Sequence, residues 1–314
     1  MRKRSVFLGI VLAVICVVAV SCERDGVYQP KKKISKIYYD YVTGKDLYCT
    51  WVWDGDKLNT IVYPRGTELQ FYYIGNQIDS VCKVIPNYPT GSNYYKFIYD
   101  KKKHHLVAVD CYRYSIGWVE SLKAHYEFIY SKDGHISDMN IEYYSVSPYD
   151  KSSELDDDLL VMLTALPQIP QPVFFQLFSE VKQTKGLLET RHVTFEYEGD
   201  KMVRCTYTYG TYVETYDFAY SHVKNPFHNL LNQSLEWPFP YVTSNQYMLN
   251  STTGLTVVSG EVEYSTFAWA ADFDYDVEEE YPTRMTYHSR SWQVSPSYPD
   301  TSYITQTYYF EYMN

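Results

Sequence analysis

The chain has 314 residues and a formal net charge of −10, with 45% hydrophobic and 21% charged residues. This composition excludes a disordered tail and a polytopic helical membrane protein, and the negative charge argues against nucleic acid as a partner. Tyrosine is the outlier, because the 36 tyrosines outnumber the 28 lysines and arginines together. Amphipathic rings at this density favour half-buried sheet faces over helices.

The first 21 residues have the pattern of a secretory signal. Three basic residues, 2–4, precede an apolar run over 6–20 that falls short of the ~20 residues needed to span a bilayer. The run ends in Ala19-Val20-Ser21-Cys22, which resembles the lipobox of bacterial lipoproteins. That resemblance implies cleavage before Cys22 and an outer-membrane lipoprotein held by a lipid on its thiol, on the periplasmic or the outer surface. Ordinary cleavage after Ser21 is the alternative.

Removal of residues 1–21 leaves 25 basic against 38 acidic residues, a net charge of −13. Residues 22–33 then form the lipidated cysteine and a polar tether, and residues 34–314 a single domain. Four cysteines fall in that domain without any C-x-x-C spacing, which argues against zinc. One or two disulfides and buried free thiols both remain open. These cysteines are Cys49, Cys82, Cys111 and Cys205.

One short pattern recurs along the chain: aromatic-x-aromatic, a polar turn, then an apolar residue and another three positions later. Copies begin at Trp51, Phe71, Phe97, Phe128, Phe195, Phe218 and Phe273, and the chain stops at a last Phe310-Glu311-Tyr312. Period-two alternation interrupted by Asp-Gly, Gly-Asn or Gly-Asp is typical of β-hairpins, because these residues tolerate positive φ in tight turns. The pattern predicts a mainly β fold, a large curved antiparallel meander of tyrosine-rich hairpins.

The segment over about 153–186 interrupts the repeats with a different period. Leucines recur at helical spacing over 155–166, behind three aspartates at 156–158 that favour a helix N-terminus. A second apolar stripe follows Pro172 and ends before Gly186. The sequence therefore predicts an αα-hairpin insertion packed on the sheet.

The C-terminal half carries a resemblance to a known family. It contains Phe218-Ala219-Tyr220 followed by Lys224-Asn225-Pro226-Phe227, and Phe273-Asp274-Tyr275-Asp276 followed by Tyr281-Pro282-Thr283-Arg284-Met285. With the signal peptide and the aromatic repeats, residues 34–314 resemble exported lipoproteins classed as a domain of unknown function with a porin-like fold. The resemblance implies a strongly curved sheet that closes like a barrel, and it implies no activity. Glu280 departs from the family pattern, which has Gly before Tyr-Pro.

Two tryptophans are the candidate ligand-binding residues. Trp118 follows Gly117 in a predicted loop, and Trp237 stands beside two prolines, so both are expected to be exposed. Exposed aromatic faces stack on the apolar faces of sugars, although cross-strand packing explains paired aromatics equally well. For metals, Asp272, Asp274 and Asp276 alternate on one strand face and form a weak calcium candidate. A solvated charged stripe is the alternative, and no cofactor is expected.

Catalytic signatures are mostly missing from the sequence. The pattern S-x-x-K occurs at 80–83 and at 179–182, but neither copy has the companion motifs of β-lactamases. We therefore expect a non-catalytic protein that binds a glycan, a peptide or an envelope partner. The alternatives are an envelope structural or assembly protein with only protein partners, and a polymer-acting hydrolase whose carboxylates are distant in sequence.

Overall fold

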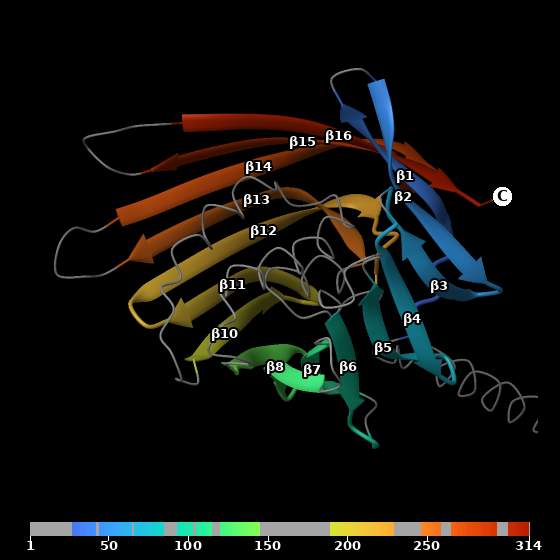
Figure 1. Ribbon diagram of the computed structural model, residues 1–314. Helices are drawn as coiled ribbons and strands as arrows, with labels where there is room; N and C mark the ends of the chain where they lie inside the picture. The colour runs from blue at the N-terminus through green and yellow to red at the C-terminus, as the bar shows by residue number, and fades with distance from the viewer. Residues whose placement is uncertain are drawn as a thin grey trace, which may run out of the picture.

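The computed structural model describes residues 27–41, 44–64, 66–84, 93–102, 105–114, 120–144, 189–228, 246–258, 265–293 and 301–313. Sixteen β-strands make up this part of the chain (Figure 1). Their bounds are β1 Ile34–Tyr41, β2 Gly44–Asp54, β3 Lys57–Val62, β4 Glu68–Ile74, β5 Gln77–Val84, β6 Asn93–Tyr99, β7 Leu106–Tyr114, β8 Glu120–Tyr130, β9 Ile136–Tyr143, β10 Glu189–Glu198, β11 Lys201–Tyr209, β12 Tyr212–Lys224, β13 Tyr247–Val258, β14 Ser265–Glu278, β15 Tyr281–Gln293 and β16 Thr301–Tyr312.

Each strand pairs antiparallel with its neighbour in sequence, and β1 pairs with β16, so the sheet closes into a barrel. The expected antiparallel meander is therefore confirmed, and its closure is settled. The predicted helical insertion at about 153–186 lies outside the described residues, as do the predicted signal segment at 1–21 and the predicted lipidation site Cys22.

The barrel has two chemically different ends. We call turn end the end where tight hairpins at 55–56, 75–76, 199–200 and 279–280 connect the strands. Residues 31–33 and 313 lie there too, because the backbone N–H of Met313 donates to the Lys33 carbonyl. The opposite end, which carries the connections at 42–43, 63–67 and 210–211, is called the loop end.

Each copy of the recurring sequence pattern forms the same kind of hairpin at the turn end. Before each turn, the first aromatic of the pattern lies buried on the inner wall, as Trp51, Phe71 and Phe97 do. After the turn, a register shift adds one residue to the returning strand in the hairpins β2–β3, β4–β5, β6–β7, β8–β9 and β10–β11. The spacing of three between Leu58 and Ile61 follows from this bulge, because the extra residue returns both side chains to the same buried face.

The second aromatic of the pattern, with the exception of Tyr197, hydrogen-bonds to the backbone of a neighbouring strand. Tyr73 of β4, for example, donates its hydroxyl hydrogen to the Leu58 carbonyl at 2.8 Å on β3. Five further tyrosines donate in the same way to backbone carbonyls: Tyr99 to Ile78, Tyr130 to Leu106, Tyr220 to Met202, Tyr275 to Leu249 and Tyr312 to Pro282. The indole N–H of Trp53 donates to the Ile34 carbonyl. These seven donor–acceptor distances lie between 2.5 and 2.8 Å.

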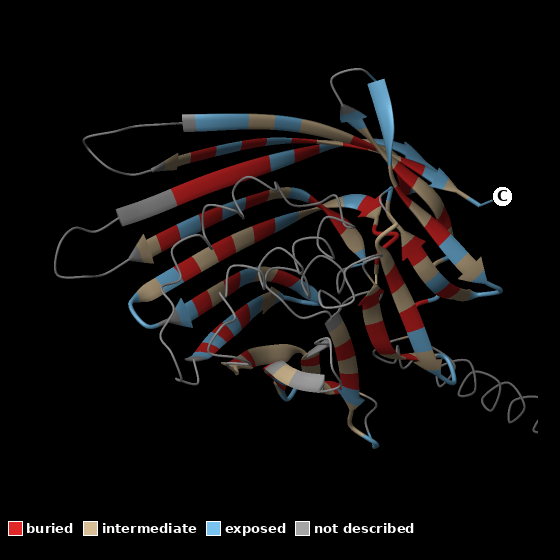
Figure 2. Ribbon diagram, viewed as in Figure 1, coloured by how far each residue is buried: buried red, intermediate tan, exposed pale blue. Residues whose placement is uncertain are grey.

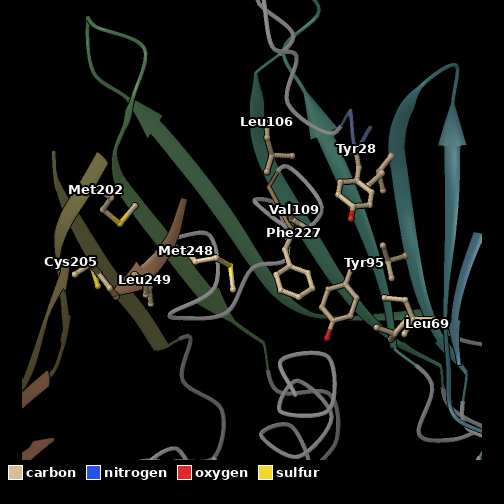
Figure 3. Close-up of a cluster of buried hydrophobic side chains, with 14 of the residues drawn as sticks. Tyr28, Leu69, Tyr95, Leu106, Val109, Met202, Cys205, Phe227, Met248 and Leu249 are labelled. Atoms are coloured by element: carbon tan, nitrogen blue, oxygen red, sulfur yellow. The ribbon is translucent and has the colours of Figure 1, made fainter. Parts of the chain in front are cut away.

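The interior near the turn end is an apolar core. A barrel of sixteen strands is too wide for its wall side chains to meet across the lumen. Residues 225–227 and Tyr28 lie buried at this end, where the Phe227 ring is 6.0 Å from the rings of Trp51 and Phe310. Figure 3 shows Tyr28 and Phe227 among side chains of several wall strands, including Leu106, Met202 and Leu249.

The outer wall is polar, and burial alternates along the strands accordingly (Figure 2). Polar cross-strand contacts lie far from either end, as in the Arg204–Asp217 ion pair at 2.6 Å and the His125–Asp110 contact at 2.6 Å. The inner face near the turn end is thus apolar, and charged pairs lie on the outer face, where a membrane-spanning barrel has an apolar band.

The four cysteines of the domain, Cys49, Cys82, Cys111 and Cys205, are free thiols, which settles the question that the sequence left open. Burial raises the pKa of the Cys49 thiol to about 12, so it is inert at neutral pH. Within the described ranges, no helix is long and apolar enough to cross a bilayer.

Candidate functional site

A group of buried polar side chains lines the loop-end half of the interior. We call it the polar inner wall, and it comprises Arg191 on β10, Tyr207 on β11, Glu214 and Tyr216 on β12, Thr256 on β13 and Trp269 on β14. These are five consecutive strands of one sheet, so the six side chains form a continuous surface. None of the six is more than 7% exposed.

Arg191 occupies one side of this surface. Its Nη1 donates to the Tyr207 hydroxyl at 2.7 Å, and its guanidinium carbon lies 4.5 Å from the centre of the Tyr143 ring. A guanidinium stacked on an aromatic face and held by a phenol is fixed in orientation, because its planar fork loses little freedom on binding. Arg191 is therefore a preorganised donor.

Glu214 lies directly across from Tyr207 in the β11–β12 ladder and accepts a hydrogen bond from the Tyr216 hydroxyl at 3.1 Å. Burial, and then the negative charge of Glu214, keep the pKa of Tyr216 well above 10. The phenol therefore remains a donor at every physiological pH. Tyr207 thus separates a buried cation from a buried anion on the inner wall.

Trp269 and Thr256 contribute two further polar atoms to the wall. Gly254 is the cross-strand neighbour of both Tyr216 and Trp269, and a Cβ added to it would fall 2.1 Å from the indole Nε1. The indole therefore uses the space that glycine leaves on the wall. Trp269 also interacts with the Tyr216 hydroxyl, which slightly offsets the rise in the pKa of Tyr216. Within the described part of the chain, the Thr256 hydroxyl has no hydrogen-bond partner. An unpartnered buried group costs about 1–3 kcal/mol, so this hydroxyl is a position where a polar ligand would be favoured.

The chemistry of the wall suits a neutral ligand rich in hydroxyl groups. Aromatic faces at Tyr216 and Trp269, whose ring centroids are 5.7 Å apart, adjoin a carboxylate, a guanidinium and a hydroxyl. The buried charges of Arg191 and Glu214 balance, which does not favour an ionic ligand.

Most residues that sequence reasoning nominated are not in this site. Trp118 and Trp237 lie outside the described residues, so their role stays a prediction. Asp272, Asp274 and Asp276 form an exposed stripe on the outer face of β14, where Asp276 pairs with Arg284 at 2.9 Å and Asp274 with His288 at 3.4 Å. No group of three potential metal ligands occurs among the described residues.

The S-x-x-K pattern at 80–83 does not form a nucleophile site. Ser80 lies opposite exposed Tyr72 on the outer face of β5, whereas Lys83 is buried on the inner face, opposite buried Leu69. The β-bulge in this hairpin does not bring the two side chains to one face. The second copy, at 179–182, lies outside the described residues.

A signal for the polar inner wall was nevertheless present in the sequence. Arg191, Glu214 and Trp269 each stand four residues before the first aromatic of a repeat, at Phe195, Phe218 and Phe273. Side chains in a strand alternate between the two faces of the sheet. The residue four positions before an inward-facing aromatic therefore also faces inward. A charged residue at that position of the repeat is therefore expected to be buried. Short sequence motifs do not reveal this, because the charged residues belong to different repeats.

No protein-family model and no curated protein matches the chain. Among solved structures, the chain is similar to a porin-like protein from Bacteroides uniformis, with a TM-score of 0.45 and 9% sequence identity. That alignment covers 92% of this chain and 100% of the other. None of these comparisons assigns an activity.

Proposed function

We propose that the protein is a non-catalytic lipoprotein of the outer membrane whose barrel stands in water and binds a glycan on its polar inner wall. The observation that carries this proposal is the polarity of the barrel, which is polar outside and, inside, apolar at one end and mixed at the other. The lipid anchor, the location and the glycan are inferred from the sequence and from the chemistry of the wall.

The outer wall supports a barrel surrounded by water. An arginine or lysine at the midplane of a bilayer costs roughly 2–4 kcal/mol on a barrel surface. Lys96, Arg204 and Arg284 all face outward at cross-strand pairs, together with their carboxylate partners. Three such residues would cost roughly 6–12 kcal/mol, which is comparable with the whole ~5–15 kcal/mol stability of a typical domain.

The signal segment and Cys22 then attach the protein to the membrane, because the outer wall does not insert into it. A cleaved signal leaves no spanning segment at the N-terminus, and one cysteine-linked lipid group holds the chain at the membrane surface. This part of the proposal depends on the lipobox-like residues 19–22.

The first test separates anchor from fold. The Cys22→Ser variant is expected to move from the membrane to the soluble fraction, and to remain monodisperse without detergent. Persistent membrane association would contradict the lipid anchor, and aggregation that only detergent relieves would contradict a barrel in water.

The second test addresses the ligand. A glycan-array screen of the detergent-free protein is expected to identify a neutral glycan, and Glu214→Gln is expected to weaken its binding at least tenfold. Glu196→Gln is the matched control, because Glu196 is exposed on the outer face of β10. If no glycan binds while cross-linking in cells captures envelope proteins, the structural or assembly alternative is correct.

The hydrolase alternative has weaker support. Glycoside hydrolysis needs two carboxyl groups roughly 5–9.5 Å apart. In the described part of the chain, the interior buries one carboxylate, that of Glu214. A bound glycan recovered unchanged after prolonged incubation is the expected result.

A further inference from the structure

We propose that the turn end of the barrel rests on the lipid surface, and that the loop end with its polar inner wall points away from the membrane. This inference rests on the proposed lipidation of Cys22. Its structural basis is the path of residues 27–33 and the distribution of exposed apolar side chains.

Residues 27–33 are fixed to the turn end rather than free. Tyr28 is buried, donates its hydroxyl hydrogen to the Pro226 carbonyl at 2.7 Å and stacks on Trp53. Lys33 donates to the Gly55 carbonyl at 2.9 Å and pairs with Asp56 at 2.6 Å. The predicted tether is therefore docked over this stretch, and the chain leaves the barrel at the turn end.

The remaining chain is too short to reach the other end. Four residues, 23–26, separate Cys22 from the first described residue. Five Cα–Cα steps span at most ~18 Å. A strand such as β14, with 14 residues, is about 46 Å long and, at the usual tilt of a barrel strand, rises roughly 35 Å along the axis. The lipid on Cys22 therefore holds the turn end close to the bilayer.

A second observation, independent of the tether, concerns apolar side chains exposed at the same end. We call exposed apolar rim the seven large hydrophobic side chains that are exposed within three residues of the turn-end connections or of the C-terminal end of β16: Val52, Tyr72, Ile74, Ile98, Ile129, Val277 and Met313. Among the described residues, four others of this kind lie near the loop end. Ile74, next to the turn at 75–76, is 70% exposed.

The rim fits a lipid surface better than water. Aliphatic side chains at the headgroup level add burial energy, and lysines beside them keep their ammonium groups in the polar layer. Lys31, Lys101, Lys102 and Lys132 lie in or beside the turn-end connections and supply that second element.

The test measures depth in lipidated protein reconstituted on vesicles of phosphatidylethanolamine and phosphatidylglycerol. A fluorophore is attached to Asn76→Cys at the turn end or to Thr211→Cys at the loop end, both in a Cys82→Ser background that removes the partly exposed thiol. Lipid-borne nitroxide is expected to quench the Asn76 label at least threefold more than the Thr211 label. Equal or reversed quenching overturns the orientation.

Vesicle flotation separates this proposal from the proposed function. If either labelled protein fails to float, the anchor itself is refuted. If both float and the Thr211 label is quenched, the orientation alone is refuted.

A longer tether then tests contact by the rim. Twenty glycine and serine residues inserted between Arg24 and Asp25 are expected to leave the Asn76 label quenched, whereas the further changes Ile74→Ser and Ile98→Ser release it. Loss of quenching upon insertion alone overturns contact by the rim. Protection of the Asn76 label in cells without quenching on pure lipid vesicles would indicate a protein partner at the turn end, and would equally overturn the proposal.

Discussion

The same strands form an apolar core at one end of the barrel and a polar inner wall at the other. At the turn end, a repeated pattern places an aromatic ring, a bulge and a phenol–carbonyl hydrogen bond at each hairpin, and apolar side chains complete the interior. At the loop end, the same alternation directs Arg191, Glu214 and Trp269 inward, and the Thr256 hydroxyl has no partner among the described residues. The residues of the repeated pattern thus stabilise the fold, and the residues that lie outside the pattern form the candidate site.

The turn between β14 and β15 illustrates how a deviation is compensated. Glu279 and Glu280 have φ values of 50° and 72°, which are unfavourable for residues other than glycine. Lys32 pairs with Glu279 at 2.7 Å and Lys224 pairs with Glu280, while the backbone N–H of Lys224 donates to the Glu280 carbonyl. The positive φ of these two glutamates is therefore accommodated by contacts from two neighbouring segments.

The largest predicted effect is alkaline unfolding of the tyrosine-rich interior. Burial raises the pKa of Tyr28, Tyr216 and Tyr275 above 10, so their stabilisation is complete below pH 10 and is lost as pH rises toward the folded-state pKa. At about pH 12, each tyrosine that stays protonated in the folded state lowers the free energy of unfolding by about 3 kcal/mol, because the same tyrosine ionises in the unfolded chain. Circular dichroism and tyrosinate absorbance should change together above pH 10. Gradual ionisation with the fold intact would show that the phenols are not buried.

The apolar turn-end core should be sensitive to truncation. Phe227→Ala removes a ring that contacts Trp51 and Phe310, and we expect a loss of about 3–5 kcal/mol in the free energy of unfolding. Tyr303→Ala is the control, because Tyr303 is exposed near the loop end and should change stability by less than about 0.5 kcal/mol. Equal losses in a urea titration would contradict the division between the two ends.

The tight turns should require positive φ. Gly134, between β8 and β9, has φ 89°, so Gly134→Val is expected to cost about 1 kcal/mol or more. Glu280→Gly should leave the thermal midpoint unchanged or raise it, since relief of backbone strain offsets an exposed ion pair. A Gly134→Val protein as stable as the parent would contradict the turn assignment.

The phenol–carbonyl bonds should each contribute a smaller amount. Tyr73→Phe removes the bond to Leu58 and is expected to destabilise by about 1 kcal/mol. Tyr197 is the matched residue of another repeat; it stacks on His135 at 4.6 Å, and its hydroxyl has no equivalent bond among the described residues. Tyr197→Phe should therefore be close to neutral, and a similar loss in both variants would show that the ring, rather than the bond, stabilises the wall.

The smallest predicted effect has the opposite sign. Thr256→Val replaces an unpartnered buried hydroxyl with a methyl group, and we expect it to stabilise the protein by about 1 kcal/mol while weakening ligand binding. Thermal denaturation with and without ligand measures both effects. Destabilisation would mean that the hydroxyl has a partner in the native protein.

Sequence reasoning recovered the hairpins because turn chemistry and alternation are local. The positive φ of Gly55, Gly75, Gly134 and Gly199 agrees with the turns inferred from Asp-Gly, Gly-Asn and Gly-Asp pairs. Closure depends on pairing of β1 with β16, far apart in the chain, and only the resemblance pointed to it. The polar inner wall was missed because its members lie on five strands, and no short window of sequence contains more than two of them.

The most direct test of the central claim is the environment of the outer wall in the lipid-anchored protein on vesicles. Thr253 is exposed at the middle of β13, and a spin label on Thr253→Cys in the Cys82→Ser background reports whether water or lipid surrounds it. We predict greater accessibility to a water-soluble paramagnetic nickel chelate than to oxygen, with no change when vesicles are added. Greater accessibility to oxygen, appearing only with vesicles, would place the wall in the bilayer and contradict a barrel whose outer face is surrounded by water.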